Sequence, residues 1–356
     1  MFFTGHYSLR RRVTQRTHAT NGTSRRTFLL VMASTTLAVP IFFTGVGPQM
    51  SAKAAVPSFE FGPRTVPASR SVPGIASKPL LFVSNGTDRV DIFLQAGKNK
   101  LVGHITGLSK PAGMTTDAAG NLYVTNYGAQ GAQAVPVYAP PYNSGPYLTL
   151  STPVGYLPYA VAVSRKGVVA VAIVCTDGSC SIESFVSFFA KGSTTPCATI
   201  SLANPPVMPY SVAFDHTGNL FLVGQIGSGP YMSEISGGCS ATTVKPLTAG
   251  NSDSLGGLFA VGVNQSNQVA VLDTDHGYLC TYNHPQHGSF GNPVYTTTGL
   301  DGAVDFAFTA SGRDLFAIIN SRSVSEIDYP SGVLDKTFNL PSGGGDDLAV
   351  TPALVP

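Results

Sequence analysis

Acidic and amide side chains stand at two kinds of position in this sequence, and their oxygens could bind a cation or a polar ligand. Asp305, Asp346 and Asp347 stand where short apolar segments begin. Four more stand near the ends of such segments: Asn85, Asn126, Asp273 and Asn320. Carboxylate and amide oxygens are the ligands that Ca²⁺ prefers. The set therefore predicts a ligand site, with Asp305 and Asp347 as the candidate metal ligands.

The same side chains have a structural interpretation, which the sequence favours. Two or three carboxylates without an ordered ligand spacing are a weak metal signal, and they also serve to cap loops and bind water. His284-Pro-Gln-His287 has a zinc-like spacing, but its proline predicts a loop and no third ligand accompanies it. Catalytic residues therefore stay unassigned. The sequence requires no cofactor, and Ca²⁺ or another divalent cation is the one these oxygens would accept.

A repeated segment sets the positions of these residues. Its clearest copy is 110–126, KPAGMTTDAAGNLYVTN, which predicts a strand, a turn and a second strand. Degraded copies begin at Tyr159, Tyr210, Phe259 and Val304, with a period of about 45 to 51 residues. This is the period of a four-stranded propeller blade.

The two ends of the repeat region complete each other. Residues 80–85 match the second strand of the repeat, and no first strand precedes them; residues 347–352 match the first strand, and then the chain stops. Ring closure removes the open edges of a linear array. The sequence thus predicts an all-β, six-bladed propeller over residues 78–356, with the C-terminal strand completing the first blade.

Aligned copies place acids and aromatic residues at one end of the central channel. The first residues of the inner strands are Ala112, Tyr159, Tyr210, Phe259, Val304 and Asp346. The next column is Gly113, Ala160, Ser211, Ala260, Asp305 and Asp347. Three acids thus face an aromatic stretch across the channel mouth. In the alternation of side chains along a strand, Tyr159 and Tyr210 fall on the same face as the core residues. This predicts packing against the blades rather than against a ligand.

Residues 1–54 are predicted to be a twin-arginine signal peptide. Ser24-Arg25-Arg26-Thr27-Phe28-Leu29-Leu30 has the export motif, an apolar run follows to Val46, and Ala52-Lys53-Ala54 suits cleavage. An uncleaved anchor is the alternative, since about 20 apolar residues just span a bilayer. Residues 55–77, rich in proline, predict an extended linker. The expected location is outside the cell or in its envelope, with no membrane attachment after cleavage.

Charge and cysteine content agree with export. The leader holds 7 of the 21 Lys and Arg and none of the 19 Asp and Glu, so the remainder is acidic and a nucleic-acid partner is not expected. All five cysteines follow the leader. Cys175 and Cys180 flank a four-residue Asp-Gly turn, which predicts a hairpin disulfide. A Cys180–Cys197 bridge is the open alternative, and at least one of the five thiols stays unpaired in a monomer, most simply as a small buried hydrophobe.

The repeat Asp-x-x-Gly-Asn-Leu-Tyr-Val-x-Asn resembles that of six-bladed propellers of the NHL-repeat and gluconolactonase-like kind. Leu-Tyr-Val-Thr-Asn126 also resembles the Tyr-Val-Thr-Asn repeat of surface propellers. Gluconolactonase-like enzymes hold a divalent metal at the channel mouth with a Glu, an Asn and an Asp. None of the four glutamates here begins an inner strand, and this departs from that pattern: Glu60, Glu183, Glu234 and Glu326.

The functional prediction is a secreted, monomeric, non-enzymatic binding or scaffold module. Its partner would be a protein, a glycan or a small molecule. The rival prediction is a metal-dependent hydrolase or lyase, lactonase-like, working at the channel mouth. An enzyme requires Asp305, Asp347 and an Asn or Asp273 to converge on one point.

Overall fold

A computed structural model describes most of the region after the linker. The described residues are 69–71, 78–128, 133–153, 155–175, 184–203, 205–227, 229–249, 255–285, 288–296, 299–341 and 344–352. Every described residue lies within one compact unit, Ser58–Pro356. The export motif at Arg25 and Arg26 lies outside the described residues. No helix in the described part is long and apolar enough to cross a membrane.

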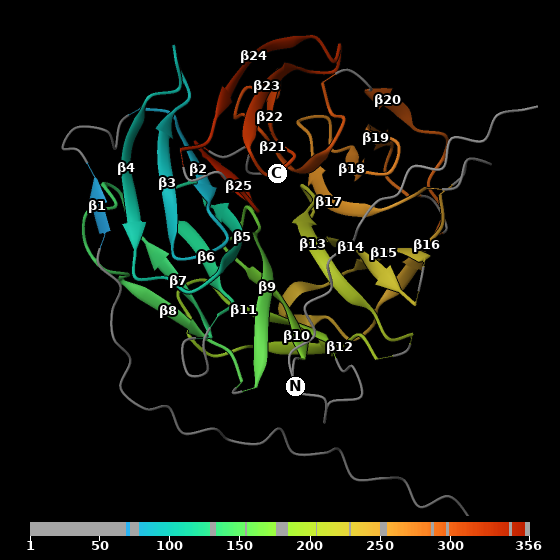
Figure 1. The fold of residues 1–356 in the computed structure, drawn as a ribbon. Helices are drawn as coiled ribbons and strands as arrows, with labels where there is room; N and C mark the ends of the chain where they lie inside the picture. Colours follow the sequence, from blue (N-terminus) through green and yellow to red (C-terminus); the bar gives the residue numbers. More distant parts are fainter. Residues whose placement is uncertain are drawn as a thin grey trace, which may run out of the picture. The chain divides into compact units, whose positions relative to one another are not determined.

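Six antiparallel sheets, the blades of a propeller, are arranged in a ring (Figure 1). Blade 2 contains β5 (Pro111–Thr116), β6 (Leu122–Asn126), β7 (Ala134–Tyr138) and β8 (Leu148–Ser151). Blade 3 contains β9 (Tyr156–Val163), β10 (Val169–Cys175), β11 (Phe185–Phe189) and β12 (Ala198–Ser201). Blade 4 contains β13 (Met208–Phe214), β14 (Leu220–Ile226), β15 (Gly229–Ile235), the 3₁₀ turn η1 (Gly238–Ser240) and β16 (Lys245–Leu247).

The last two blades in the chain repeat the same order. Blade 5 contains β17 (Leu258–Val263), β18 (Val269–Asp273), β19 (Tyr278–Tyr282) and β20 (Val294–Thr296). Blade 6 contains β21 (Ala303–Phe308), β22 (Asp314–Ile319), β23 (Ser323–Asp328) and β24 (Leu334–Asn339). The first strand of each blade contacts the first strands of its two neighbours, so these strands surround the channel (Figure 1).

Blade 1 joins the two ends of the described region, which confirms the predicted closure. The C-terminal strand β25 (Leu348–Thr351) pairs with β2 (Leu80–Ser84), which is followed by β3 (Arg89–Leu94) and β4 (Leu101–Thr106). This blade has a fifth strand that the sequence did not predict. β1 (Ser69–Ser71), within the segment interpreted as a linker, pairs antiparallel with β4. An extended segment beside the open outer edge of a sheet can complete its hydrogen bonds in this way.

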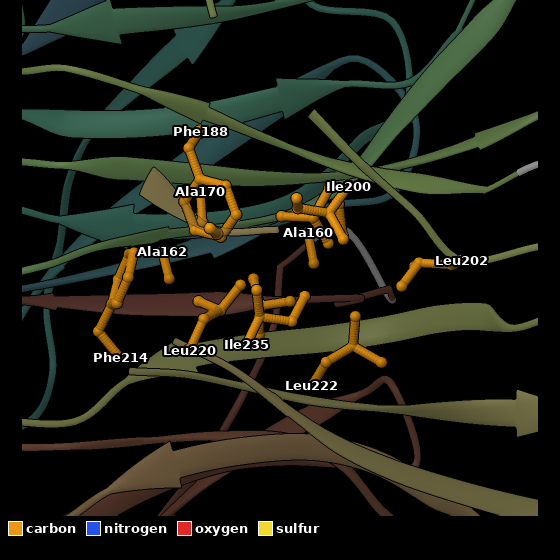
Figure 2. Packing of buried hydrophobic residues seen from close by; sticks show 14 of the residues in the cluster. Ala160, Ala162, Ala170, Phe188, Ile200, Leu202, Phe214, Leu220, Leu222 and Ile235 are labelled. Carbon is orange, nitrogen blue, oxygen red and sulfur yellow. The ribbon is translucent and has the colours of Figure 1, made fainter. Parts of the chain in front are cut away.

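Hydrophobic side chains fill the wedges between blades. The cluster between blades 3 and 4 is the largest, and Figure 2 shows how its side chains lie. Alanines 160, 162 and 170 on the blade 3 side leave room for the larger Phe214 and Leu222 of blade 4. This pairing of small and large side chains explains why aligned positions of the repeat alternate between small and large residues.

The Asp-x-x-Gly-Asn turns are structural, as the repeat predicts. Asp215 Oδ1 accepts hydrogen bonds from the backbone N–H groups of Thr217, Gly218 and Asn219 at 2.7–2.9 Å. Gly218 has a φ of 96°, a left-handed conformation that favours glycine. Blade 5 uses Asn267 at this position with a φ of 58°, which asparagine tolerates better than most residues.

The structure shows a disulfide that sequence reasoning did not find. Cys197 and Cys239 are bonded, with an S–S distance of 2.04 Å, and they link blade 3 to blade 4. This excludes the alternative Cys180–Cys197 bridge. The predicted Cys175–Cys180 bridge lies outside the described residues, because Cys180 is not among them. Cys280 is a free, buried thiol whose pKa burial raises to about 12, which confirms the expectation of a small buried side chain.

Candidate functional site

A cavity of about 370 Å³ lies at the mouth of the central channel, where the inner strands begin. Aromatic residues line it from blades 2 to 5: Tyr127, Tyr159, Tyr210 and Phe259. Asp305 of blade 6 and Asp346 and Asp347 of blade 1 line the rest of the ring. The volume is within the range of small-molecule sites. The predicted arrangement of acids opposite aromatic residues is therefore present as a cavity.

Four rings form a continuous arc in the cavity wall, which we call the aromatic arc: Tyr127, Tyr159, Tyr210 and Phe259. Successive ring centroids are 5.7, 6.3 and 5.2 Å apart, and the last pair is stacked with an interplanar angle of 12°. Tyr210 is fixed further by its hydroxyl, which donates to Gln225 Oε1 at 2.6 Å. Phe259 is 44% exposed. The arc is thus held by ring contacts and still open to the cavity.

β-Bulges explain why Tyr159 and Tyr210 line the cavity. In β9, Pro158 and Ala160 pair with adjacent residues of β10, which leaves Tyr159 between them unpaired. The same irregularity leaves out Tyr210 in β13, Phe259 in β17 and Val304 in β21. A bulge inserts one residue and re-aims its side chain. The sequence interpretation expected these tyrosines to pack against the blades rather than against a ligand; the structure places them in the cavity wall, where their rings also contact each other.

Asp305 and Asp347 each hold the inner strand of the next blade. Asp305 Oδ2 accepts the backbone N–H of Leu348 at 2.8 Å, and Asp347 Oδ1 accepts that of Met114 at 2.7 Å. Ser211 occupies the same column in blade 4, and its Oγ accepts the N–H of Val261 at 3.2 Å. These two carboxylates therefore have a structural role that a neutral acceptor performs elsewhere in the ring.

The electrostatic environment of the acids opposes their ionisation. Burial raises the pKa of Asp305 to about 7, against its hydrogen bonds from the Leu348 and Phe306 backbones. Burial, and then the nearby charge of Asp305, raise the pKa of Asp347 well above its usual value. Asp346 is more exposed, and partial burial raises its pKa as well. Near neutral pH, the pair Asp305 and Asp347 thus holds a proton that exposed carboxyls would lose.

Tyr159 connects the two walls of the cavity electrostatically. The pKa of Tyr159 is raised to about 12, first by burial, then by the Tyr127 and Tyr210 hydroxyls and by Asp346 and Asp347. The carboxylates of blade 1 therefore act electrostatically on the aromatic arc across the cavity.

Close approach of the inner strands explains why small residues share a column with these acids. A Cβ added to Gly113 would lie 2.6 Å from both the Cα of Ala160 and the carbonyl oxygen of Tyr159. β5 and β9 thus approach too closely for any larger residue there. In this column acids occur only in blades 6 and 1.

The other residues proposed as ligands do not line this cavity. Asp273 is buried, accepts the Gly256 N–H at 3.1 Å and contacts His276 Nδ1 at 2.8 Å. Asn126 accepts the Ser109 N–H at 2.6 Å. Asn85 caps its own turn by accepting three backbone N–H groups, and the Asn320 N–H donates to the Gly302 carbonyl.

The cavity also has residues that sequence reasoning missed. Lys110, Tyr127 and Ser321 lie just outside the aligned columns and line its rim. Tyr127 directly follows the second strand of its blade, and this position in the repeat was the available signal. Within the described residues, no group of three or more His, Cys, Asp or Glu side chains has an arrangement that could hold a metal ion.

Comparison with solved structures identifies the same fold in other proteins. No known family model and no curated protein matches the chain. A protein of unknown function from Bacteroides caccae has a TM-score of 0.57 and 12% identity, over 77% of this chain and 99% of that one. The periplasmic gluconolactonase of Pseudomonas aeruginosa has a TM-score of 0.50 and 16% identity, over 78% of this chain and 99% of that one.

A streptogramin B lyase is also similar, with a TM-score of 0.44 and 12% identity over 74% of each chain. At these identities the likeness shows the propeller fold alone.

Proposed function

We propose that this protein is an exported, non-enzymatic binding module that takes a small ligand in the channel-mouth cavity. The observation that carries the proposal is the cavity itself, with four aromatic rings on one wall and three carboxylates on the other. Binding sites of small molecules are concave, largely apolar and supplied with a few polar groups that orient the ligand.

Export is part of the same proposal. The Cys197–Cys239 bridge supports an oxidising compartment, and the twin-arginine motif at Arg25 and Arg26 supplies the route. We further assign the blades to the NHL-like and gluconolactonase-like kind, on the Asp-x-x-Gly-Asn turns that Asp117 and Asp215 form.

The rival function, a metal-dependent hydrolase or lyase, has less support in the geometry. Asp305 and Asp347 each already accept a backbone N–H. None of the amide side chains proposed as further ligands lines the cavity. A propeller with a lactonase among its structural relatives keeps this rival worth testing. Lactone turnover that needs a divalent cation and is lost in Asp347→Asn would establish it.

Thermal unfolding with a small-molecule library tests the binding function. A ligand at a hundredfold excess over its Kd stabilises the folded protein by about 2.7 kcal/mol. The library should contain amines, neutral sugars, lactones and Ca²⁺, the last after EDTA treatment. Ala112 lines the cavity, so Ala112→Trp should fill it. A ligand that binds in the cavity should then no longer raise the unfolding temperature. Ala190→Trp, at an exposed position, is the matched control. Shifts that survive Ala112→Trp would place the ligand elsewhere.

A further inference from the structure

We infer that the ligand of the channel-mouth cavity is a small organic cation, such as an amine or a quaternary ammonium compound. The inference rests on the proposed binding function and specifies the chemistry of that site. It follows from three features of the cavity: the four rings gathered in the aromatic arc, the acids opposite them, and the presence of carboxylates where the fold requires only acceptors.

The aromatic arc provides the apolar half of such a site. Aromatic ring faces attract cations within about 6 Å of the ring centroid, and the attraction strengthens when the cation is desolvated. Successive rings of the arc are 5.2–6.3 Å apart, so a ligand against the wall meets more than one of them. Cations with methyl or methylene groups lose little hydration on entering such a site.

The charge opposite the arc is negative. Asp305, Asp346 and Asp347 line the cavity with one basic side chain, the exposed Lys110. Asp346 lies against Gly86, which has a φ of 66°, and a Cβ added there would lie 2.0 Å from Asp346 Oδ2. The turn at Gly86 therefore leaves space that the Asp346 carboxylate occupies beside the cavity.

The fold itself does not require carboxylates at these positions. The hydrogen bonds from Leu348 and Met114 need only an acceptor oxygen, which an amide supplies and which Ser211 supplies in blade 4. Burying two carboxyls side by side opposes ionisation of both. A bound cation offsets this repulsion, whereas a neutral ligand leaves it in place. Perturbed acids in a cavity are a recognised mark of a functional site.

A single tryptophan would report occupancy, because the chain has none. Phe259→Trp places it in the cavity wall, where it also retains a strong cation-binding ring. The probes are choline and its neutral isostere 3,3-dimethylbutan-1-ol, followed by tryptophan emission in the variant and by calorimetry in the unsubstituted protein. Choline should bind at least about tenfold more tightly than the isostere.

The variant Asp346→Asn tests the charge. It removes an exposed carboxylate that lines the cavity and should weaken choline binding about threefold to tenfold without weakening the isostere. Asp301→Asn, which removes the same charge from the exposed turn before β21, is the matched control and should leave both affinities unchanged.

Three results would overturn the inference, and they separate it from the proposed function. Equal binding of choline and the isostere, or binding of a neutral sugar or of Ca²⁺ in place of choline, would reject an organic cation while leaving a ligand in the cavity. Choline binding that Asp346→Asn leaves unchanged would reject the role of the acids. No response to choline by either method would also reject the inference. The cavity-filling Ala112→Trp comparison then decides separately whether the cavity binds any ligand.

Discussion

Replacing Asp305 by asparagine should stabilise the protein at neutral pH and should not do so in acid. The amide oxygen of asparagine can still accept the Leu348 N–H, which Asp305 Oδ2 accepts at 2.8 Å. The substitution removes only the ionisation of a carboxyl that is 8% exposed. It therefore separates the hydrogen bond that holds β25 from the cost of a buried charge.

The magnitude follows from the pKa. Burial raises the pKa of Asp305 from 3.8 to about 7. Between these values the folded protein holds a proton that the unfolded chain has lost, so its free energy of unfolding falls by about 1.4 kcal/mol per pH unit. Below the lower value both states are protonated and the effect vanishes; above the higher value it is fully developed. The stability difference between Asp305→Asn and the unsubstituted protein should therefore grow by about 2–3 kcal/mol from about pH 5 to pH 7.

Urea denaturation at several pH values measures this difference. Asp301→Asn is the control, because it removes an exposed carboxyl from the turn before β21, and its effect should stay within about 0.5 kcal/mol at every pH. A difference that is flat with pH, or one in which the unsubstituted protein gains on Asp305→Asn as pH rises, would refute the reasoning. A flat difference would mean that folding leaves the pKa of Asp305 unchanged, and a gain by the unsubstituted protein would mean that the backbone donors stabilise the ionised carboxylate.

Three further predictions concern other features of the fold and the site. Loss of the Cys197–Cys239 bridge, by reduction or by serine substitution of both residues, should lower the free energy of unfolding by up to about 4 kcal/mol in urea titrations, because the bridge closes a 42-residue separation. Gly113→Ala should destabilise by about 1–3 kcal/mol or more, since its Cβ would strike the backbone of β9, whereas Gly291→Ala, with open space around it, should be nearly neutral in the same assay. Choline affinity, measured by calorimetry, should rise about tenfold between about pH 6 and pH 8 as Asp305 ionises, and an unchanged or falling affinity would contradict this. The other titratable groups around that cavity are Lys110, Asp346, Asp347, Tyr127, Tyr159 and Tyr210.

The ring was predictable because the repeat has a fixed period and the two halves of blade 1 are recognisable at opposite ends of the region. Residues 80–85 and 347–352 could only be second and first strands of one blade, and β25 does pair with β2. The column containing Asp305 and Asp347 was predictable for the same reason. Register carries over from blade to blade once a single turn is aligned.

Side-chain direction at the channel mouth was not predictable in this way. A bulge adds one residue and reverses the parity of everything before it, yet the residues themselves look like an ordinary strand. Tyr159 and Tyr210 therefore carried a core pattern and line a cavity. Asn85 and Asn126 do not line the cavity: the Asn85 side-chain oxygen caps its own turn, and that of Asn126 accepts the Ser109 N–H. The Cys197–Cys239 bridge joins neighbouring blades at residues outside the repeat, where no period aligns them.

The position of the acids connects ligand binding to the closure of the ring. β25 comes from the C-terminal end of the propeller, and it is held on one side by the bond from the Leu348 N–H to Asp305 and on the other by the bond from Met114 of β5 to Asp347. Hydrogen bonds to an ionised carboxylate are stronger than those to a protonated one. A cation that favours ionisation of this pair therefore strengthens the two bonds that fasten the closing strand. Asp305 and Asp347 thus destabilise the ligand-free ring at neutral pH, and a positively charged ligand would stabilise the ring through the same two residues. An asparagine at either position should therefore close the ring well and bind such a ligand poorly.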